Sequence, residues 1–579
     1  MTPGHPTRAG TLLLALALPL SVFGQPASLE HPSGWTPKQA ASARREIIGT
    51  ANPLATDAGY RILRRGGSAV DAAIAVQMVL NLVEPQSSGI GGGAFMLVHD
   101  ARRQTLTAYD GRETAPAAAR PDRFLDETGR PLPFLDAVVG GRSVGVPGTL
   151  RMLELAHRRH GRLPWAILFA PAIRLASEGF VVSPRLSHAI AAERFGQDRA
   201  RAYFHNADGS PLAAGQRLAN PAFAATLERI ASAGAAAFYS GEIARDMVRT
   251  VADYRASPGD LSAADLAGYR AIARTPVCSR YRRYKVCGMP PPSSGGIGVL
   301  QMLGILERFD MQAIGGSALL RTHLFSEAGR LAYADRAAYI ADPAFVAPRP
   351  GLLDRDYLRL RSESIRLDAS IGHAAAGVPP PRRGAAFGIG AAPEFPSTSH
   401  VSIVDRYGNA VAMTTTIEHA FGSTLLTAGG FLLNNELTDF SFLPECDGAP
   451  VANRVEAGKR PRSTMAPTIA YDARGRVAIV AGSPGGSSII NYVAKTLVGI
   501  IDWRLDPQAA IDLPNVGSRN GPVEIERGSL AVALVDKLHA LGDATRIVDQ
   551  DSGLQVVVRT ARGWSGAADP RREGSVRGD

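Results

Sequence analysis

The chain has 579 residues, of which 45% are hydrophobic and 20% charged, a composition typical of a globular protein with a large core. Its formal net charge is +10, but the basic residues occur as scattered pairs such as Arg282–Arg283 and never as a run of five. Together with an aromatic content of 6%, this pattern argues against a nucleic-acid-binding protein and allows only a mild preference for acidic small molecules or surfaces.

The N-terminal residues are predicted to be a signal peptide. Arg8 precedes an apolar run, Thr11–Phe23, which is followed by small and polar residues. The run is too short to span a bilayer and has the length of a signal-peptide core. We therefore expect residues 1–24 to be removed, with cleavage after Gly24 or Ala27, and the mature protein to be periplasmic or secreted without a stable membrane span. A retained membrane anchor is the alternative.

A helical pattern runs from Pro53 to Leu82, with a break at Gly66–Gly67, and ends in EPQSSGIGGG before a strand that begins at Phe95. The glycine run looks like a dinucleotide-binding fingerprint. Its order is reversed, however, because a helix precedes it and a strand follows. Close packing of backbone against backbone explains these glycines better.

Residues 150–270 are predicted to be mostly helical from the spacing of their apolar residues. The next segment, VCSRYRRYKVC, is typical of two short strands around a turn at Arg282–Arg283. A two-residue turn places Cys278 opposite Cys287 in a non-hydrogen-bonded pair, where side chains approach most closely. We expect a disulfide between them in an oxidising compartment, although Arg-Arg is poor chemistry for the favoured turns. Cys446 is then unpaired, and the cysteines and histidines have no spacing that predicts a metal site.

Residues 372–397 are rich in Gly, Ala and Pro, which makes this segment the natural place for a chain to be cut, and 372–396 is predicted to be an exposed loop. Thr398 follows this loop at the start of a strand. A cut before Thr398 would give it a free α-amino group beside its hydroxyl, so that nucleophile and base lie on one residue. The unperturbed pKa of an α-amino group, about 8, suits a general base. Taken alone, a Thr before a strand is usually only a good β-former.

The sequence after Thr398 is rich in β-hairpin signals, with strands predicted at 401–404 and 410–417 and at 468–471 and 477–481. The last strand leads into GSPGGSS and a helix at Ile489–Trp503. Backbone N–H groups at Gly485 and Gly486, where this helix starts, suit a developing oxyanion, although such a turn is common.

Two polar clusters in this half could bind charged groups. LLNNELTDF places Glu436 and Asp439 three residues apart, where a carboxylate pair could hold an ammonium group. A solvated turn is the equal alternative. KRPRSTMAPT offers the hydroxyls of Ser463 and Thr464 to a carboxylate, although such a pair is more often part of a plain turn.

The order and spacing of these motifs resemble those of the γ-glutamyltransferase (glutathione hydrolase) family of N-terminal-nucleophile hydrolases. The resemblance runs from about residue 46 to DPRREG at Asp569–Gly574 and includes EPQSSGIGGG, GRETAPA, GVPGT, PPPSSGG, TSHVSIVD, TTTIEHAFGS, LLNNELTDF, KRPRSTMAPT and GSPGGS. It implies an α+β fold, a four-layer αββα sandwich with one core shared by two fragments. These are a large fragment, residues 25–397, and a small catalytic fragment, residues 398–579.

The resemblance also implies a role for each matching residue. The precursor is expected to cut itself between Ser397 and Thr398, with Thr398 then acting as the catalytic nucleophile, oriented by Thr416. Gly485 and Gly486 match the oxyanion-hole donors. The implied substrate-binding residues are Arg112, which would pair with the donor's α-carboxylate, Ser463 and Thr464, which would assist it, and Glu436, Asp439 and Glu418, which would contact the α-ammonium. Bidentate pairing is the physical reason for Arg.

Three residues or segments depart from the family pattern. Thr464 stands where Ser is usual, Glu418 stands where several members carry Asn, and the segment from Asp439 to Ser463 is shorter than in members with a full lid loop.

The implied reaction transfers a γ-glutamyl group from glutathione or a related compound to water or to an amino-acid or peptide acceptor. It needs no metal or organic cofactor, and its catalyst is a heterodimer made from one precursor. One alternative is an acylase for glutaryl or β-lactam side chains, against which Glu436 and Asp439 argue, since a glutaryl group has no amine. Another is an inactive periplasmic binding homologue that never processes, against which the intact Thr398 and Thr416 argue.

Overall fold

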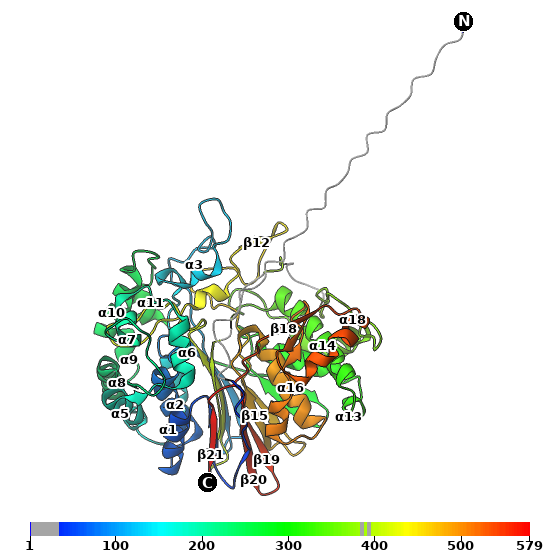
Figure 1. The fold of residues 1–579 in the computed structure, drawn as a ribbon, viewed down its shortest axis with the longest axis horizontal. Helices are drawn as coiled ribbons and strands as arrows, with labels where there is room; N and C mark the ends of the chain where they lie inside the picture. Colours follow the sequence, from blue (N-terminus) through cyan, green and yellow to red (C-terminus); the bar gives the residue numbers. More distant parts are fainter. Residues whose placement is uncertain (2–33, 382–386, 391–394, 396) are drawn as a thin grey trace.

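The protein folds as two antiparallel sheets packed face to face, with helices on the outer face of each (Figure 1). The computed structural model describes residue 1 and residues 34–381, 387–390, 395 and 397–579. Apart from Met1, the predicted signal peptide lies outside the described residues. The layers are helix, sheet, sheet and helix, so the predicted αββα sandwich is confirmed.

Each main sheet has seven strands. The first sheet has the order β21 (Ser575–Gly578), β2 (Ile47–Thr50), β10 (Ser399–Val404), β11 (Ala410–Thr416), β3 (Gly93–Asp100), β4 (Thr105–Gly111) and β7 (Ile272–Arg274). The second has the order β1 (Ala41–Ala43), β20 (Gly563–Ala568), β19 (Gln555–Thr560), β15 (Val477–Gly482), β14 (Thr468–Tyr471), β9 (Tyr284–Gly288) and β8 (Val277–Tyr281). Both sheets take strands from before and after Thr398, so the two sides of that residue share one core.

The helices form two groups. Against the first sheet lie α1 (Pro53–Arg64), α2 (Ala69–Val83), α4 (Thr149–His160), α5 (Ala170–Glu178), α6 (Pro184–Ala192), α7 (Asp198–Phe204), α8 (Pro221–Ala233), α9 (Ala236–Tyr239), α10 (Gly241–Ala252) and α11 (Ala263–Gly268). On the side of the second sheet lie α12 (Gly295–Leu306), α13 (Met311–Ile314), α14 (Ala318–Tyr339), α15 (Arg355–Glu363), α16 (Ile489–Ile501), α17 (Pro507–Asp512) and α18 (Val535–Ala540). The helices predicted in 53–82 and 150–270 are confirmed.

Shorter elements join these layers. They are α3 (Phe134–Val138), the pair β5 (Phe180–Val181) and β6 (Arg217–Leu218), the hairpin β12 (Glu445–Cys446) and β13 (Ala449–Pro450), and a sheet of β16 (Val516–Gly517), β17 (Val523–Glu526) and β18 (Thr545–Val548). In the part of the chain that the structure describes, no helix combines the length and the apolar character that a membrane crossing requires.

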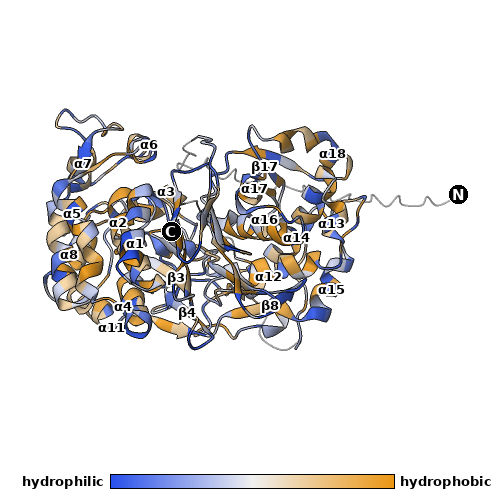
Figure 2. Cartoon of the chain, turned by 90° about the horizontal axis from the view of Figure 1, so that it is seen from below, coloured by the Kyte–Doolittle hydropathy of each residue, from blue (hydrophilic) through white to orange (hydrophobic). Residues whose placement is uncertain are grey.

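The strands of the first sheet are apolar on both faces because both faces are covered. In β3, Met96 and Val98 pack with the helices α1 and α2, whereas Phe95 and Leu97 pack between the two sheets. This alternation follows from the two-residue period of a strand. The helices α12 and α16, largely hydrophobic in Figure 2, complete the core on the other side.

The hairpin β8–β9 carries the disulfide between Cys278 and Cys287, which pair directly across the two strands with their Cα atoms 4.1 Å apart. In its turn, Arg282 has φ +52°, a conformation that side chains rarely adopt. Its guanidinium donates hydrogen bonds to Asp502 Oδ1 and to two backbone carbonyls, each at 2.8 Å. These contacts hold a residue that is unfavourable for such a turn.

Removing this disulfide should lower the free energy of unfolding. In a Cys278→Ala/Cys287→Ala variant the unfolded chain regains the freedom of a short closed loop, which is worth about 2–3 kcal/mol. Guanidinium unfolding of the purified protein measures the change. Cys446 is a free, half-buried cysteine, so Cys446→Ala is the matched control and should shift stability by less than about 0.5 kcal/mol. Equal stability of the double variant and the control would contradict a stabilising role.

Candidate active site

The ends of four neighbouring strands in the first sheet bring the predicted catalytic residues to one edge. In the register of β10 and β11, Ser399 pairs with Thr415, so Thr398 lies opposite Thr416. Thr416 pairs in turn with the first residue of β3. The second residue of β3 pairs with the last residue of β4, directly before Arg112.

The glycine run between α2 and β3 packs tightly against this edge. A Cβ atom at Gly91 would lie 2.0 Å from the carbonyl oxygen of Leu432, and one at Gly92 would lie 2.1 Å from that of Thr416. Only glycine fits where two backbones approach so closely. The prediction that these glycines serve backbone packing is confirmed at Gly91 and Gly92, whereas a Cβ at Gly93 would meet the carboxylate of Glu113 at 2.2 Å.

Thr398 is buried, with 3% of its surface exposed. The hydroxyl of Thr416 donates to the carbonyl oxygen of Ser397 at 2.9 Å and lies 3.4 Å from Thr398 Oγ1. Thr398 Oγ1 donates to the same carbonyl oxygen. The hydroxyls of Thr398 and Thr416 therefore both donate to the carbonyl oxygen of the predicted scissile bond. The hydrogen bond from Thr416 polarises this carbonyl group.

The residue before Thr398 is buried. Ser397 is only 1% exposed, because its hydroxyl donates to the carbonyl oxygen of Gln86 at 2.6 Å and its own carbonyl accepts from Thr416. The buried residue directly follows the segment 372–396 that is predicted to be an exposed loop. A bond so deeply enclosed is out of reach of another protease, which favours cleavage by groups of this chain.

Sequence reasoning missed Arg572 as a neighbour of Thr398. Its Nη1 donates to the carbonyl oxygen of Thr398 at 3.1 Å. The rest of its guanidinium is held by Asp551, through the backbone carbonyl at 2.9 Å and the carboxylate at 2.8 Å. The motif DPRREG contains this arginine, but only the structure shows that it reaches the threonine.

The turn after β15 lies at the corresponding edge of the second sheet. Gly485 has φ +131° and Gly486 φ +53°. A Cβ at Gly485 would meet the ring of Tyr492 at 2.4 Å, so the turn requires glycine. At the end of β15, a Cβ at Gly482 would lie 2.2 Å from the ring of His400 in β10, which brings the turn to the strand that follows Thr398.

Ser463 and Thr464 are fixed beside this turn. Thr464 Oγ1 donates to the carbonyl oxygen of Gly486 at 2.7 Å. The carbonyl oxygen of Ser463 accepts from the backbone N–H and the hydroxyl of Ser294, at 2.7 and 2.6 Å. The PPPSSGG loop and the turn at Gly485–Gly486 therefore both hold the predicted carboxylate-binding segment in place.

Arg112 is fully buried and forms ion pairs with Glu436 and Asp439. Its other N–H groups donate to the backbone carbonyls of Pro461 and Arg462, at 3.0 and 2.9 Å. The residues predicted to bind the two charged ends of an amino acid are thus in direct contact. A zwitterionic amino-acid group would replace this pairing, with its carboxylate on Arg112 and its ammonium between the acids.

Carboxyl groups outnumber cations around Arg112. Glu113 and Glu418 join Glu436 and Asp439, and all four are buried. Burial raises the pKa of Glu113 and of Glu436 to about 8, and burial together with the nearby Asp439 and Glu436 raises that of Glu418 well above its usual value. Within the described part of the chain, Glu418 Oε1 and Glu436 Oε2 have no hydrogen-bond donor. The cluster is therefore suited to a ligand that brings a positive charge.

Glu418 connects this acidic cluster to the nucleophile. Its backbone N–H donates to Thr416 Oγ1 at 2.9 Å, and its carboxylate accepts from Asn435, the neighbour of Glu436. It holds φ +76°, a strained conformation for a residue with a side chain, and such strain is concentrated at functional sites.

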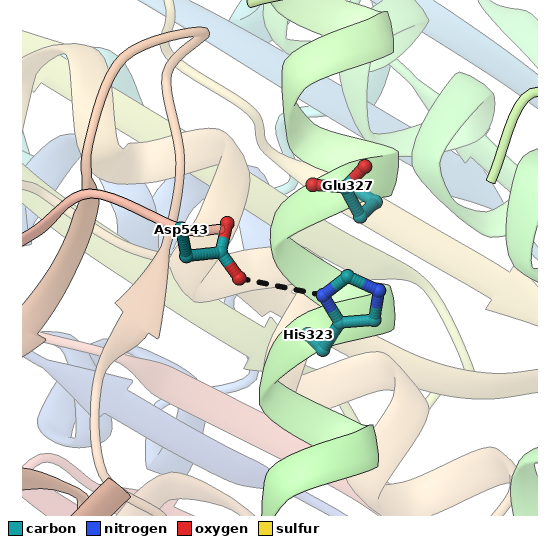
Figure 3. A group of neighbouring side chains, drawn as sticks. All are labelled: His323, Glu327 and Asp543. Atoms are coloured by element: carbon teal, nitrogen blue, oxygen red, sulfur yellow. Dashed lines mark hydrogen bonds and ion pairs between the residues drawn. The ribbon is translucent and has the colours of Figure 1, made fainter. Parts of the chain in front are cut away.

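Among the described residues, one group of His, Asp and Glu side chains is close enough to bind a metal ion: His323, Glu327 and Asp543 (Figure 3). His323 and Glu327 lie one turn apart on α14, and Asp543 follows α18. The guanidinium of Arg330 donates to Glu327 at 2.9 Å and to Asp543 at 2.6 Å. Arg330 supplies the positive charge that a metal would bring, so this group is an ion-pair cluster.

Comparison with known proteins agrees with this geometry. The family model of γ-glutamyltranspeptidase matches residues 55–578. This chain belongs to the γ-glutamyltranspeptidase family. It is 37% identical over 554 residues to a glutathione hydrolase proenzyme of Bacillus subtilis strain 168. The matched region covers 93% of this chain and 92% of that relative.

Two solved structures of the wider family share the fold. A cephalosporin acylase from Bacillus halodurans has a TM-score of 0.80 at 26% identity, covering 94% of this chain and 97% of that chain. The γ-glutamyltranspeptidase of Helicobacter pylori has a TM-score of 0.53 at 34% identity, covering 58% of this chain and 95% of that chain. This chain is therefore similar both to a γ-glutamyltranspeptidase and to an acylase.

Proposed function

We propose that this protein is a γ-glutamyltransferase and glutathione hydrolase that becomes active by cutting its own chain between Ser397 and Thr398. The observation that carries the proposal is the excess of buried carboxyl groups around Arg112, beside the threonine pair. A γ-glutamyl donor has a carboxylate for the arginine and an ammonium for the acids.

Cleavage of the precursor uses groups that already converge on the scissile bond. Thr398 Oγ1 attacks the carbonyl carbon of Ser397, and the hydroxyl of Thr416 stabilises the oxyanion that forms on the carbonyl oxygen. The peptide nitrogen leaves as the amine of Thr398 and takes the hydroxyl proton. Water then hydrolyses the resulting ester and frees the carboxylate of Ser397.

Turnover uses the same hydroxyl with its new amine as base. Thr398 Oγ1 attacks the γ-carbonyl of the donor, the α-amino group takes the proton, and the N–H groups of Gly485 and Gly486 stabilise the oxyanion. The leaving amine takes that proton, and the acyl-enzyme is resolved by water or by the amine of an amino acid or peptide. The two fragments stay together as a heterodimer in the periplasm or outside the cell.

Comparing two donors tests the proposal against the acylase alternative, which the structural likeness to a cephalosporin acylase favours. A γ-glutamyl anilide and a glutaryl anilide differ only in the α-amino group. We expect kcat/KM to be at least about 100-fold higher for the γ-glutamyl compound, because the glutaryl compound leaves buried acids unpaired. Equal rates, or a preference for glutaryl, would overturn the proposal.

The pH dependence of KM follows from the raised pKa values near Arg112. Binding an ammonium favours the ionised form of Glu436, whose pKa is about 8 without it, so binding should release a proton below pH 8. We expect KM to fall by up to about tenfold per pH unit as the pH rises from 6 to 8. Steady-state kinetics measures this slope, and Glu436→Gln should flatten it. A KM of the wild type that does not change over this range would contradict the coupling.

A further inference from the structure

The segment Gly34–Ala43, here called the N-terminal strap, crosses the loop Asp569–Gly574 at the other end of the chain. The backbone N–H of Thr36 donates to the carbonyl oxygen of Pro570 at 2.9 Å. Lys38 Nζ donates to the carbonyl oxygen of Arg572 at 2.6 Å and to that of Gly574. The end of the strap, Ala41–Ala43, is β1, an edge strand of the second sheet. It joins the predicted large fragment to the predicted small one.

Two further contacts fix the strap over this loop. The ring of Trp35 lies 4.8 Å from the guanidinium of Arg571, the residue before Arg572. In β1, Ala41 pairs with Gly566 of β20, the strand that leads into the loop. The loop therefore has the strap on its outer side from Pro570 to Gly574.

The inner side of the same loop reaches the nucleophile. Arg572 is 2% exposed, and its guanidinium donates to the carbonyl oxygen of Thr398 at 3.1 Å while Asp551 holds it from behind. Lys38 thus holds the backbone of the residue whose side chain holds Thr398. Arg572 therefore links the strap to the threonine.

We propose that Lys38 is a positioning residue, which acts across the fragment boundary through Arg572 to keep Thr398 in place for self-cleavage and turnover. The inference rests on the proposed function for the role of Thr398. Lys38 is suited to this task because its ammonium donates to two carbonyls of the loop, which a shorter side chain, or one without N–H donors, would leave unpaired.

The charges around Lys38 fit this role. Burial lowers the pKa of Lys38 to about 8, while the negative charges of Asp569 and Glu573, both in the same loop, limit the shift. Even a neutral amine keeps two N–H donors, so the contact to the loop depends more on the presence of the side chain than on its charge. Replacing the Lys38 side chain is therefore a more decisive test of the contact than changing its charge by pH.

The test compares Lys38→Met with Lys38→Arg in the full-length chain. Methionine keeps the length of the side chain and removes its donors, whereas arginine restores them. We expect Lys38→Met to lower both the rate of self-cleavage, followed by pulse-chase and denaturing gel, and the kcat of the cut enzyme by about tenfold, with KM within about twofold. Lys38→Arg should recover most of both rates. Lys537→Met, at an exposed lysine of α18, is the matched control and should change neither.

Amide hydrogen exchange of the segments 569–574 and 398–404 gives a second readout that needs no substrate. Lys38→Met should speed exchange in both segments, and Trp35→Ala, which keeps the lysine, should speed it less. Unchanged cleavage and kcat in Lys38→Met, or a loss of thermal stability with normal kcat, would overturn the proposal. If the wild type does not act on γ-glutamyl compounds, the proposed function fails, while the cleavage rate and hydrogen exchange still decide the role of Lys38.

Discussion

A Thr398→Ala variant should remain one uncut chain without activity. The methyl group of alanine cannot attack the carbonyl of Ser397, and no other described hydroxyl has both the position and, after cleavage, the adjacent amine. We expect turnover to fall on the order of 10³-fold or more, as it does when a nucleophile is removed. A denaturing gel and a γ-glutamyl anilide assay measure both effects, and N-terminal sequencing of the wild-type small fragment should read Thr-Ser-His-Val.

The matched control for this variant is Thr398→Ser. Serine keeps the hydroxyl and loses the methyl group that fixes its rotamer, so it should still cut and turn over, but more slowly. Two fragments with normal turnover from Thr398→Ala would refute the assignment of the nucleophile. An uncut Thr398→Ser chain would mean that the methyl group, as well as the hydroxyl, is required to place the attack.

Replacing Arg112 by Gln should reduce kcat/KM on the γ-glutamyl donor by about 10²–10³-fold. A bidentate charged hydrogen-bond pair with the donor's carboxylate is lost, and such pairs are worth several kcal/mol when buried. The variant should also be less stable, because Glu436 and Asp439 lose the cation that neutralises them. Steady-state kinetics and thermal unfolding separate the two effects.

Two comparisons make the Arg112 result specific. Arg112→Lys keeps the charge but not the fork of donors, so its activity should lie between wild type and Arg112→Gln. Arg123→Gln breaks a partly buried ion pair with Asp260 that includes none of the four acids around Arg112, and it should leave kcat/KM within about twofold. If Arg112→Gln keeps wild-type KM and kcat, the arginine does not bind the donor.

Much of the fold could be predicted from the sequence, because apolar patterns indicate the individual strands and helices and the order of the motifs indicates the family. The apolar runs around 401–404 and 410–417 predict β10 and β11, and the register of these strands then places Thr398 opposite Thr416. The layers themselves came from the family resemblance. Periodicity alone does not say which strands lie side by side, since neighbours such as β2 and β10 are far apart in the chain.

What the sequence did not predict depends on contacts between distant segments. Arg572 touches Thr398 from 174 residues away, and Arg112 touches Glu436 from 324 residues away. The composition of 372–397 indicates only the local conformational freedom of that segment. It does not report that Gln86 and Thr416 bury its last residue. Local composition therefore gives no information about the burial of Ser397.

Strands β10 and β11 lie between β2 and β3 in the first sheet, so the chain must fold before it is cut. Once the bond before Thr398 is broken, neither polypeptide holds a whole sheet, so neither can rebuild the core between the two sheets alone. The cut enzyme inherits an arrangement that was reached while the chain was continuous. Heat or denaturant should thus inactivate the cut enzyme irreversibly. The uncut Thr398→Ala precursor keeps its chain continuous and should refold.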